Sequence, residues 1–322
     1  MGSFILRRIF QTLVVTFILS FCCYYLLTLM PGDPIDILIS SNPNFTIEDA
    51  ERLKRLYGAD KSVVERYANW LSSAVKGDFG YSRVYRIPVA DLIGPRLMNT
   101  FILSMAALLL SLSIGIPIGV LVALRKGSKV DYSVNFLSFA GISIPSFFLG
   151  ILLILCFSVY WKVFPAGGTE TIDANLQGFA YVLDRLKYLV LPVLSLTAMQ
   201  TAYYIRYTRS SMIDTMHMDF IKTARAKGLR NSIVIARHGL RNALIPVVTI
   251  VALSLSTLFS GAVITETLFS YQGVGKLVFD SISGNDFNVA MVSFIITIGM
   301  VLVMNLAADI LYAYLDPRIE YK

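Results

Sequence analysis

Six runs of this chain contain no charged side chain, and each is close in length to a membrane-spanning helix. A helix needs about 20 predominantly apolar residues to cross the hydrocarbon core of a bilayer, and one charge at its centre costs roughly 2.5–3.5 kcal/mol. The six runs therefore predict an all-α integral membrane protein with six transmembrane helices. The runs are Ile9 to Gly32, Leu97 to Leu124, Ser133 to Trp161, Tyr188 to Ile205, Ala243 to Thr265 and Phe287 to Ala308.

The composition excludes an ordinary soluble domain. Of the 322 residues, 56% are hydrophobic and only 15% are charged, whereas soluble domains have about 25% charged residues. The first run is longer than the apolar part of a cleaved signal peptide, which has about 7–15 residues, so we expect it to remain as helix one. Cys22, Cys23 and Cys156 all fall within the runs and show no disulfide or metal-ligand spacing, so no cofactor is predicted.

The basic residues are distributed unequally between the two sides of the predicted membrane. Loops on the cytoplasmic side retain Lys and Arg, and a cytoplasmic amino terminus gives fifteen basic residues inside and four in the two short external loops. This predicts a membrane protein with both termini in the cytoplasm. The net charge of +7 then reflects membrane topology, and no nucleic-acid partner is predicted. The inside set is Arg7, Arg8, Arg125, Lys126, Lys129, Arg206, Arg209, Lys222, Arg225, Lys227, Arg230, Arg237, Arg241, Arg318 and Lys322, and the external set is Lys162, Arg185, Lys187 and Lys276.

The segment between the first two runs is patterned although it is not membrane-like. Thr46 and Asp49 resemble a capping box before a short amphipathic helix that ends at Gly58. A second apolar stripe from Val63 to Ala74 predicts another helix, which ends near Gly77. These features predict a small helical subdomain on the external side, and a simple spacer is the alternative.

Motifs for catalysis are absent from the sequence. The string Gly273-Val274-Gly275-Lys276 resembles part of a P-loop, but Ser270 stands where the first glycine should be and Leu277 where the magnesium-binding hydroxyl should be. There is no zinc signature, and the two histidines, His217 and His238, lie in a basic cytoplasmic segment. We therefore expect a protein that is not an enzyme and has no ATPase site of its own.

The predicted cytoplasmic segment from Arg206 to Arg241 is longer than a turn between two membrane helices requires. Asp219 can cap a short helix that continues to Lys227 and is closed by Gly228, and a second helix starts at Asn231 or Ser232. We expect Phe220 and Ala224 to share one face of the first helix. A basic amphipathic helix of this kind either lies on anionic lipid headgroups or docks into a groove on a cytoplasmic partner.

Several strings resemble one family of transport proteins. DFIKTARAKGL at 219–229 and RHGLRNALIP at 237–246 resemble the cytoplasmic coupling loop of permeases in binding-protein-dependent ABC importers, in the dipeptide, oligopeptide and nickel branch. The opening PGDP and the long first external segment are similar to the first of the two permeases in such systems. The other matching strings are PGDP at 31–34, GDFGYS at 77–82, GIPIG at 115–119, SIPSF at 143–147, ETLF at 266–269, GVG at 273–275 and DPR at 316–318.

The resemblance implies a type I importer permease (MetI-like) fold. Residues 97–312 would form the permease core, preceded by helix one and the external segment in 1–96 and followed by a cytoplasmic tail in 313–322. Implied partners are a second homologous permease, two cytoplasmic ABC ATPases, an external substrate-binding protein and the lipid bilayer. The implied coupling helix, which would contact an ATPase, comprises Asp219, Phe220, Ile221, Lys222, Thr223, Ala224, Arg225, Ala226, Lys227 and Gly228.

The implied mechanism is alternating access driven by the ATPases, with di- or oligopeptides as the expected cargo. Nickel chelates or other small solutes are the alternative cargo, and an export or signalling complex is the alternative role. Polar groups at membrane depth usually face the interior of a helix bundle, which makes them candidates for the translocation path. These candidates are Ser143, Ser146, Gln200, Asn305 and Asp309.

Overall fold

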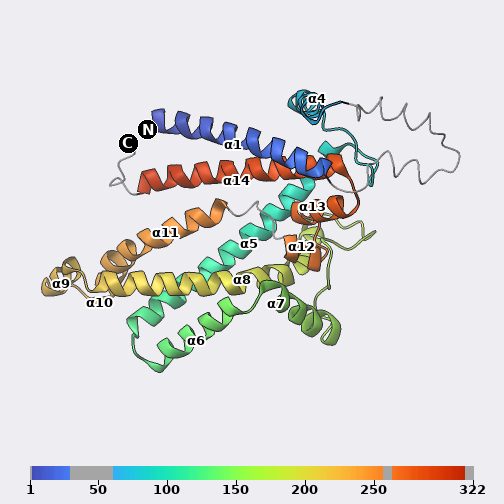
Figure 1. The fold of residues 1–322 in the computed structure, drawn as a ribbon. Helices are drawn as coiled ribbons and strands as arrows, with labels where there is room; N and C mark the ends of the chain where they lie inside the picture. The colour runs from blue at the N-terminus through green and yellow to red at the C-terminus, as the bar shows by residue number, and fades with distance from the viewer. Residues whose placement is uncertain (1, 30–60, 257–262, 316–322) are drawn as a thin grey trace, which may run out of the picture.

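The computed structural model describes residues 2–29, 61–256 and 263–315, and these residues form helices and connecting loops (Figure 1). The predicted helix ending at Gly58, the string at 31–34 and the string at 316–318 lie outside the described residues. Two of the helices, labelled η, have the wider π-helical turn. The elements are α1 (Gly2–Thr28), α4 (Val63–Val75), α5 (Val89–Leu124), α6 (Lys129–Ser143), α7 (Ser146–Leu153), η1 (Ile154–Tyr160), α8 (Gly178–Met216), α9 (Asp219–Ala226), α10 (Asn231–Ile233), η2 (Val234–Leu240), α11 (Arg241–Ser256), α12 (Val263–Leu268), α13 (Val274–Ser283) and α14 (Phe287–Leu315).

Four helices in the described part of the chain are long and apolar enough to cross a membrane, and a bent pair gives a fifth. The four are Leu6–Thr28 in α1, Val89–Leu124, Asn231–Leu255 and Phe287–Ile310. The remaining predicted run, Tyr188 to Ile205, lies inside α8, which has 39 residues. At 1.5 Å per residue α8 is about 58 Å long, so it extends beyond a hydrocarbon core of about 30 Å. The fold is therefore consistent with the six predicted membrane helices.

The predicted third membrane helix is broken. The run from Ser133 to Trp161 is divided between α6 and the pair α7–η1, which meet at an angle of 97°. Pro145 has no N–H to continue the α6 hydrogen bonds, and Ile144 before it is extended, with φ −84° and ψ 119°. This run is thus not one straight span, because proline ends the helix in its middle.

α5 and α8 form the most extensive contact between two of the described helices. A Cβ atom on Gly115 would lie 2.7 Å from Tyr204 Cβ, and one on Gly119 would lie 2.7 Å from Thr208 Cβ. Two glycines one helical turn apart therefore let the α5 backbone approach α8 directly, as small residues do in membrane helix pairs. α5 also continues across position 96/97, where the sequence suggested a boundary between two regions.

α4 confirms the second predicted amphipathic helix, and it packs against α1. The Ser62 side chain accepts from the Glu65 N–H while the Glu65 carboxylate accepts from the Ser62 N–H, which forms a capping box. Tyr67 of α4 is buried, and its hydroxyl lies 2.6 Å from that of Ser20 in α1. Its ring also meets Tyr24 edge to face at 5.5 Å. The segment predicted to be external is therefore packed against the first membrane helix.

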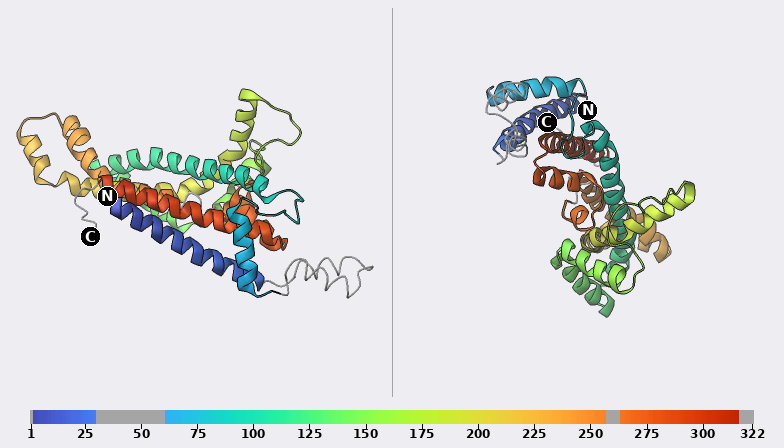
Figure 2. Two further views of the ribbon diagram at one scale, coloured as in Figure 1. Left: turned by 90° about the horizontal axis from the view of Figure 1, so that it is seen from above. Right: turned by 90° about the vertical axis from the view of Figure 1, so that its right-hand side faces the viewer.

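The helices place distant parts of the chain at two opposite ends of the molecule. α9, the beginning of α1 and the last described part of α14 lie at one end, on the left of Figure 1. α4, α12 and α13 lie at the other end, and Figure 2 shows the same separation from above. Segments expected inside the cell thus share one end, and segments expected outside share the other.

Candidate functional site

The short helix predicted in the basic segment is present as α9. Gly228 follows it with φ +74°, a conformation that costs a residue with a Cβ roughly 1 kcal/mol or more. The expected cap is wrong, because Met218 is the N-cap residue and makes no side-chain cap. Asp219 is instead the first helical residue, and its carboxylate accepts from Lys222 Nζ at 2.8 Å on an exposed surface.

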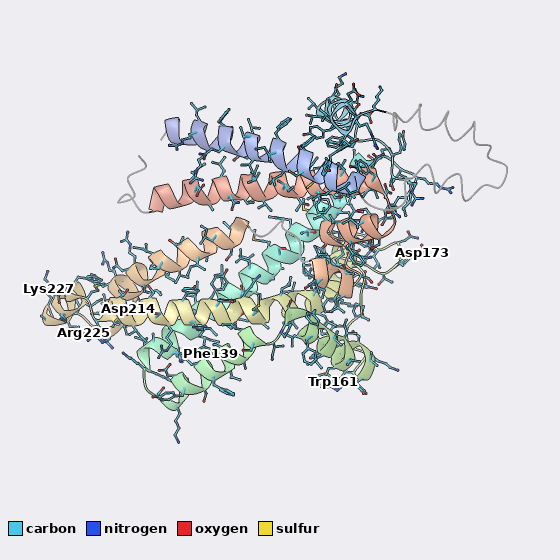
Figure 3. The ribbon with its side chains drawn as sticks, in the orientation of Figure 1. Phe139, Trp161, Asp173, Asp214, Arg225 and Lys227 are labelled. Atoms are coloured by element: carbon cyan, nitrogen blue, oxygen red, sulfur yellow. The ribbon has the colours of Figure 1, made fainter. Side chains whose placement is uncertain are left out.

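One side of α9 is buried within the chain. Ile221 and Ala224, three residues apart, are buried against Val234 of η2 and Met216 at the end of α8. Phe220, one turn before Ala224, is 42% exposed. Of the two residues predicted to share a face, only Ala224 is therefore covered by the chain itself. The side chains directed outward on α9 and its end are Phe220, Lys222, Thr223, Arg225, Ala226 and Lys227, of which Arg225 and Lys227 are labelled at the tip of the molecule (Figure 3).

The second predicted helix begins at Asn231, as expected, but it has no separate end. α10, η2 and α11 follow one another without a break, so that the stretch Asn231–Leu255 reads as one apolar helix. Ser211 of α8 donates to the carbonyl oxygen of Ala243 at 2.7 Å, and Met212 is buried beside Ala243. α9, η2 and the last turns of α8 therefore form one packed unit.

η2 and the start of α11 also carry a basic surface. Arg237, His238 and Arg241 line a cavity of about 600 Å³ together with aliphatic side chains. The remaining lining residues are Asn242, Leu244, Ile245 and Val248. None of the five predicted path residues lines this cavity. The charge pattern of the sequence did not distinguish this basic face from the rest of the basic segment.

The structure brings some of the predicted path residues close to neighbouring helices. Ser143 is exposed, and its hydroxyl donates to the Phe139 carbonyl of its own helix at 2.9 Å. The Ser146 carbonyl accepts from Ser195 Oγ at 2.7 Å, which joins α7 to α8. Gln200 Oε1 accepts from Ser111 Oγ at 3.2 Å, which joins α8 to α5. Ser146, through its backbone, and Gln200, through its side chain, therefore take part in hydrogen bonds between helices.

The other two predicted path residues lie on α14, apart from the first three. Asn305 is exposed. Asp309 accepts from Arg8 Nη1 of α1 at 3.1 Å, near the end of the molecule that carries α9. This ion pair joins α1 to α14.

A buried carboxylate whose role was not predicted from the sequence lies at the end expected to be external. Glu266 is fully buried, accepts from Thr100 Oγ1 of α5 at 2.7 Å and accepts from the Lys276 N–H of α13 at 2.9 Å. Thr100 Oγ1 in turn accepts from the Val274 N–H at 2.8 Å. The only signal in the sequence was an acidic residue directly after an apolar run. Glu266 therefore fixes α12 and α13 against the outer part of α5.

Two further acidic residues connect segments at this end in the same way. Asp286 is buried and accepts from Ser82 Oγ at 2.5 Å and from the Val84 N–H at 3.0 Å. Asp184 accepts from both the hydroxyl and the N–H of Thr171 at 2.7 Å, and these donors hold the pKa of that carboxyl below its usual range. The end expected to be external is thus held together by carboxylates whose donors lie on other segments.

Comparison with known proteins gives the chain its family. The model of the "binding-protein-dependent transport system inner membrane component" matches residues 115–321, and that family's amino-terminal model matches residues 1–104. The oligopeptide transport system permease protein AppB of Bacillus subtilis is 40% identical, and the dipeptide transport system permease protein DppB of Escherichia coli K12 is 35% identical; each alignment covers 100% of both chains.

A solved structure supports the fold independently. A chain of the MetNI methionine ABC transporter, in an inward-facing conformation, superimposes with a TM-score of 0.55 at 17% identity, covering 70% of this chain and 96% of that chain. The structural similarity supports the fold, and the sequence similarity assigns the family. This chain belongs to the family of inner-membrane permease components of binding-protein-dependent transport systems.

Proposed function

We propose that this chain is the permease subunit of a peptide importer and moves di- or oligopeptides inward across the bacterial inner membrane. One observation carries the proposal: full-length similarity, at 40% and 35% identity, to permeases named for oligopeptide and dipeptide transport. Transport proceeds by alternating access, in which the helix bundle opens first to one side of the membrane and then to the other.

The energy for transport comes from separate ATPase subunits, and α9 with Gly228 is the helix that contacts one of them. In support, α9 lies at the tip of the molecule and its inner face is packed against α8 and η2. Because Ala224 is buried within the chain, the contact is made by the outward side chains, above all Phe220, Lys222 and Arg225. The chain itself hydrolyses no ATP.

The complete transporter contains a second homologous permease, two ATPases and an external substrate-binding protein. The family description names dependence on a binding protein. The many large apolar side chains exposed on α1 and α6, such as Phe10, Phe17, Phe136 and Leu137, fit contact with lipid or with the second permease. In the division proposed here, residues 97–312 form the transport core and residues 1–96 and 313–322 are additions to it.

The translocation path runs past the polar groups of α6, α7, α8 and α14. Ser143, Ser146, Gln200 and Asn305 remain its candidate lining residues, whereas Asp309 is assigned to the ion pair with Arg8. The basic cavity beside Arg237 and Arg241 is a further candidate for the inner part of the path, since a peptide carries a terminal carboxylate that these guanidinium groups can bind.

Uptake of labelled peptides tests the proposed function. A strain that lacks only this chain is expected to lose uptake of at least one class among di-, tri- and oligopeptides, and a plasmid copy is expected to restore it. The purified single chain is expected to show no ATP hydrolysis. Unchanged uptake of every peptide class would exclude the peptide assignment, and loss of nickel uptake alone would support the alternative cargo.

A further inference from the structure

A single ion pair joins the helix that leads into α9 to a different membrane helix. Arg209 lies on α8, two turns before Met216, and its Nε and Nη2 donate to the two carboxylate oxygens of Asp131 at 2.7 and 2.8 Å. Asp131 lies in the first turn of α6 and its side chain is almost fully buried. Such a two-bond contact fixes the orientation of both groups, which one hydrogen bond cannot do.

Asp131 also organises the start of α6. Its Oδ2 accepts from the Gly127 N–H at 2.9 Å, within the turn that connects α5 to α6, and its Oδ1 accepts from Asn135 Nδ2 at 2.6 Å. The Asp131 carboxylate therefore connects Arg209 to the α5–α6 turn and to the first turns of α6. Removing Arg209 would leave the buried Asp131 carboxylate without its counter-charge, which is strongly unfavourable.

Arg206, one turn earlier on α8, makes a weaker contact with the same helix. Its guanidinium lies 4.6 Å from the centre of the Phe139 ring of α6, and both side chains are exposed. An exposed cation–π contact is weaker than a buried two-bond ion pair. The Arg209–Asp131 pair is therefore the strongest polar connection between the end of α8 and α6 among the described residues.

α9 in turn packs against the end of α8. Ile221 and Ala224 of α9 are buried against Met216 and Val234, so a displacement of α9 moves the last turns of α8 as well. We propose that Arg209 and Asp131 are positioning residues that make α6 follow α9 during transport. This inference rests on the proposed function, in which α9 receives the movement of an ATPase.

The first test measures the distance between α9 and α6 in the assembled transporter. Nitroxide labels at Lys227→Cys and at Tyr132→Cys, which is 71% exposed, report this distance before and after addition of Mg-ATP, with the three native cysteines replaced by serine. We expect an unchanged distance in the parent chain and a changed distance after Arg209→Lys, which keeps the charge but loses the second hydrogen bond. A distance that changes in the parent, or stays constant in the variant, would overturn the proposal.

The second test measures how much peptide is transported per ATP hydrolysed in proteoliposomes. Arg209→Lys and Asp131→Asn are expected to lower this ratio about tenfold, and the exchange Arg209→Asp with Asp131→Arg is expected to recover part of it. Arg8→Lys, the same change in the Arg8–Asp309 pair, is the matched control and should leave the ratio unaltered. If transport and hydrolysis fall in equal proportion, the pair only supports folding and the proposal is wrong. A parent complex that transports no peptide would count against the proposed peptide cargo. The distance measurement does not depend on the cargo, because it requires only Mg-ATP.

Discussion

At the scale of single residues, the close approach of α5 and α8 depends on positions that have no side chain. A Cβ on Gly119 would lie 2.7 Å from Thr208 Cβ and 2.8 Å from the carbonyl oxygen of Ile205. Thr208 is completely buried and the Ile205 oxygen belongs to the α8 backbone, so neither can move aside without shifting the helix. Gly299, within α14, has no atom within 4 Å of its Cβ position.

This contrast predicts opposite effects for the same substitution in two helices. Gly119→Ala should destabilise the protein by about 1–3 kcal/mol through overpacking, whereas Gly299→Ala should be neutral or stabilise it by up to about 1 kcal/mol through helix propensity. The midpoint of thermal unfolding of the purified complex in detergent measures both effects. Equal midpoints for the two variants would show that α5 and α8 are not in this close contact.

At the scale of elements, features with a local signal were predictable. α4 and the end of α9 follow from apolar spacing and from a glycine, and both are present. The break at Pro145 was not predicted, because a count of charge-free residues contains no information on helix direction. The eight residues of α9 form only two turns, so periodicity alone could not decide whether Ala224 or Phe220 faces inward. Contacts such as that of Arg209 with Asp131 join residues 78 positions apart and leave no local pattern.

The orientation of α9 predicts which of its residues can reach an ATPase. Cysteine at Arg225, on the outward side, is expected to form a crosslink with the ATPase subunit in the assembled complex. Cysteine at Ala224 is the matched control, because it is adjacent in sequence but buried against Val234 and should remain unlinked. Efficient crosslinking from position 224 and none from 225 would reverse this assignment. Labelling of position 225 by a probe in the lipid phase would favour a helix bound to headgroups.

At the scale of the whole molecule, the two ends are built differently. The proposed external end is joined by Glu266, Asp286 and Asp184, whose donors lie on other segments. The end that carries α9 depends on a small apolar cluster and on the ion pairs of Arg209 and Arg8. Because polar contacts in the outer end are buried and numerous, we expect it to move as a block, with larger rearrangements near α9.

The positions of these two ends lead to the last prediction, which concerns membrane orientation. Basic residues number fifteen on the proposed cytoplasmic side and four in the short external loops, and this bias should hold the α9 end inside the cell. Reporter fusions after Lys129 and Arg230 are expected to give a cytoplasmic signal, and fusions near Glu65 and Gly178 an external one. The fusion after Arg230 is the decisive one, since it lies directly behind α9. An external signal there would place α9 where no ATPase could contact it, and the proposed coupling would have to be abandoned.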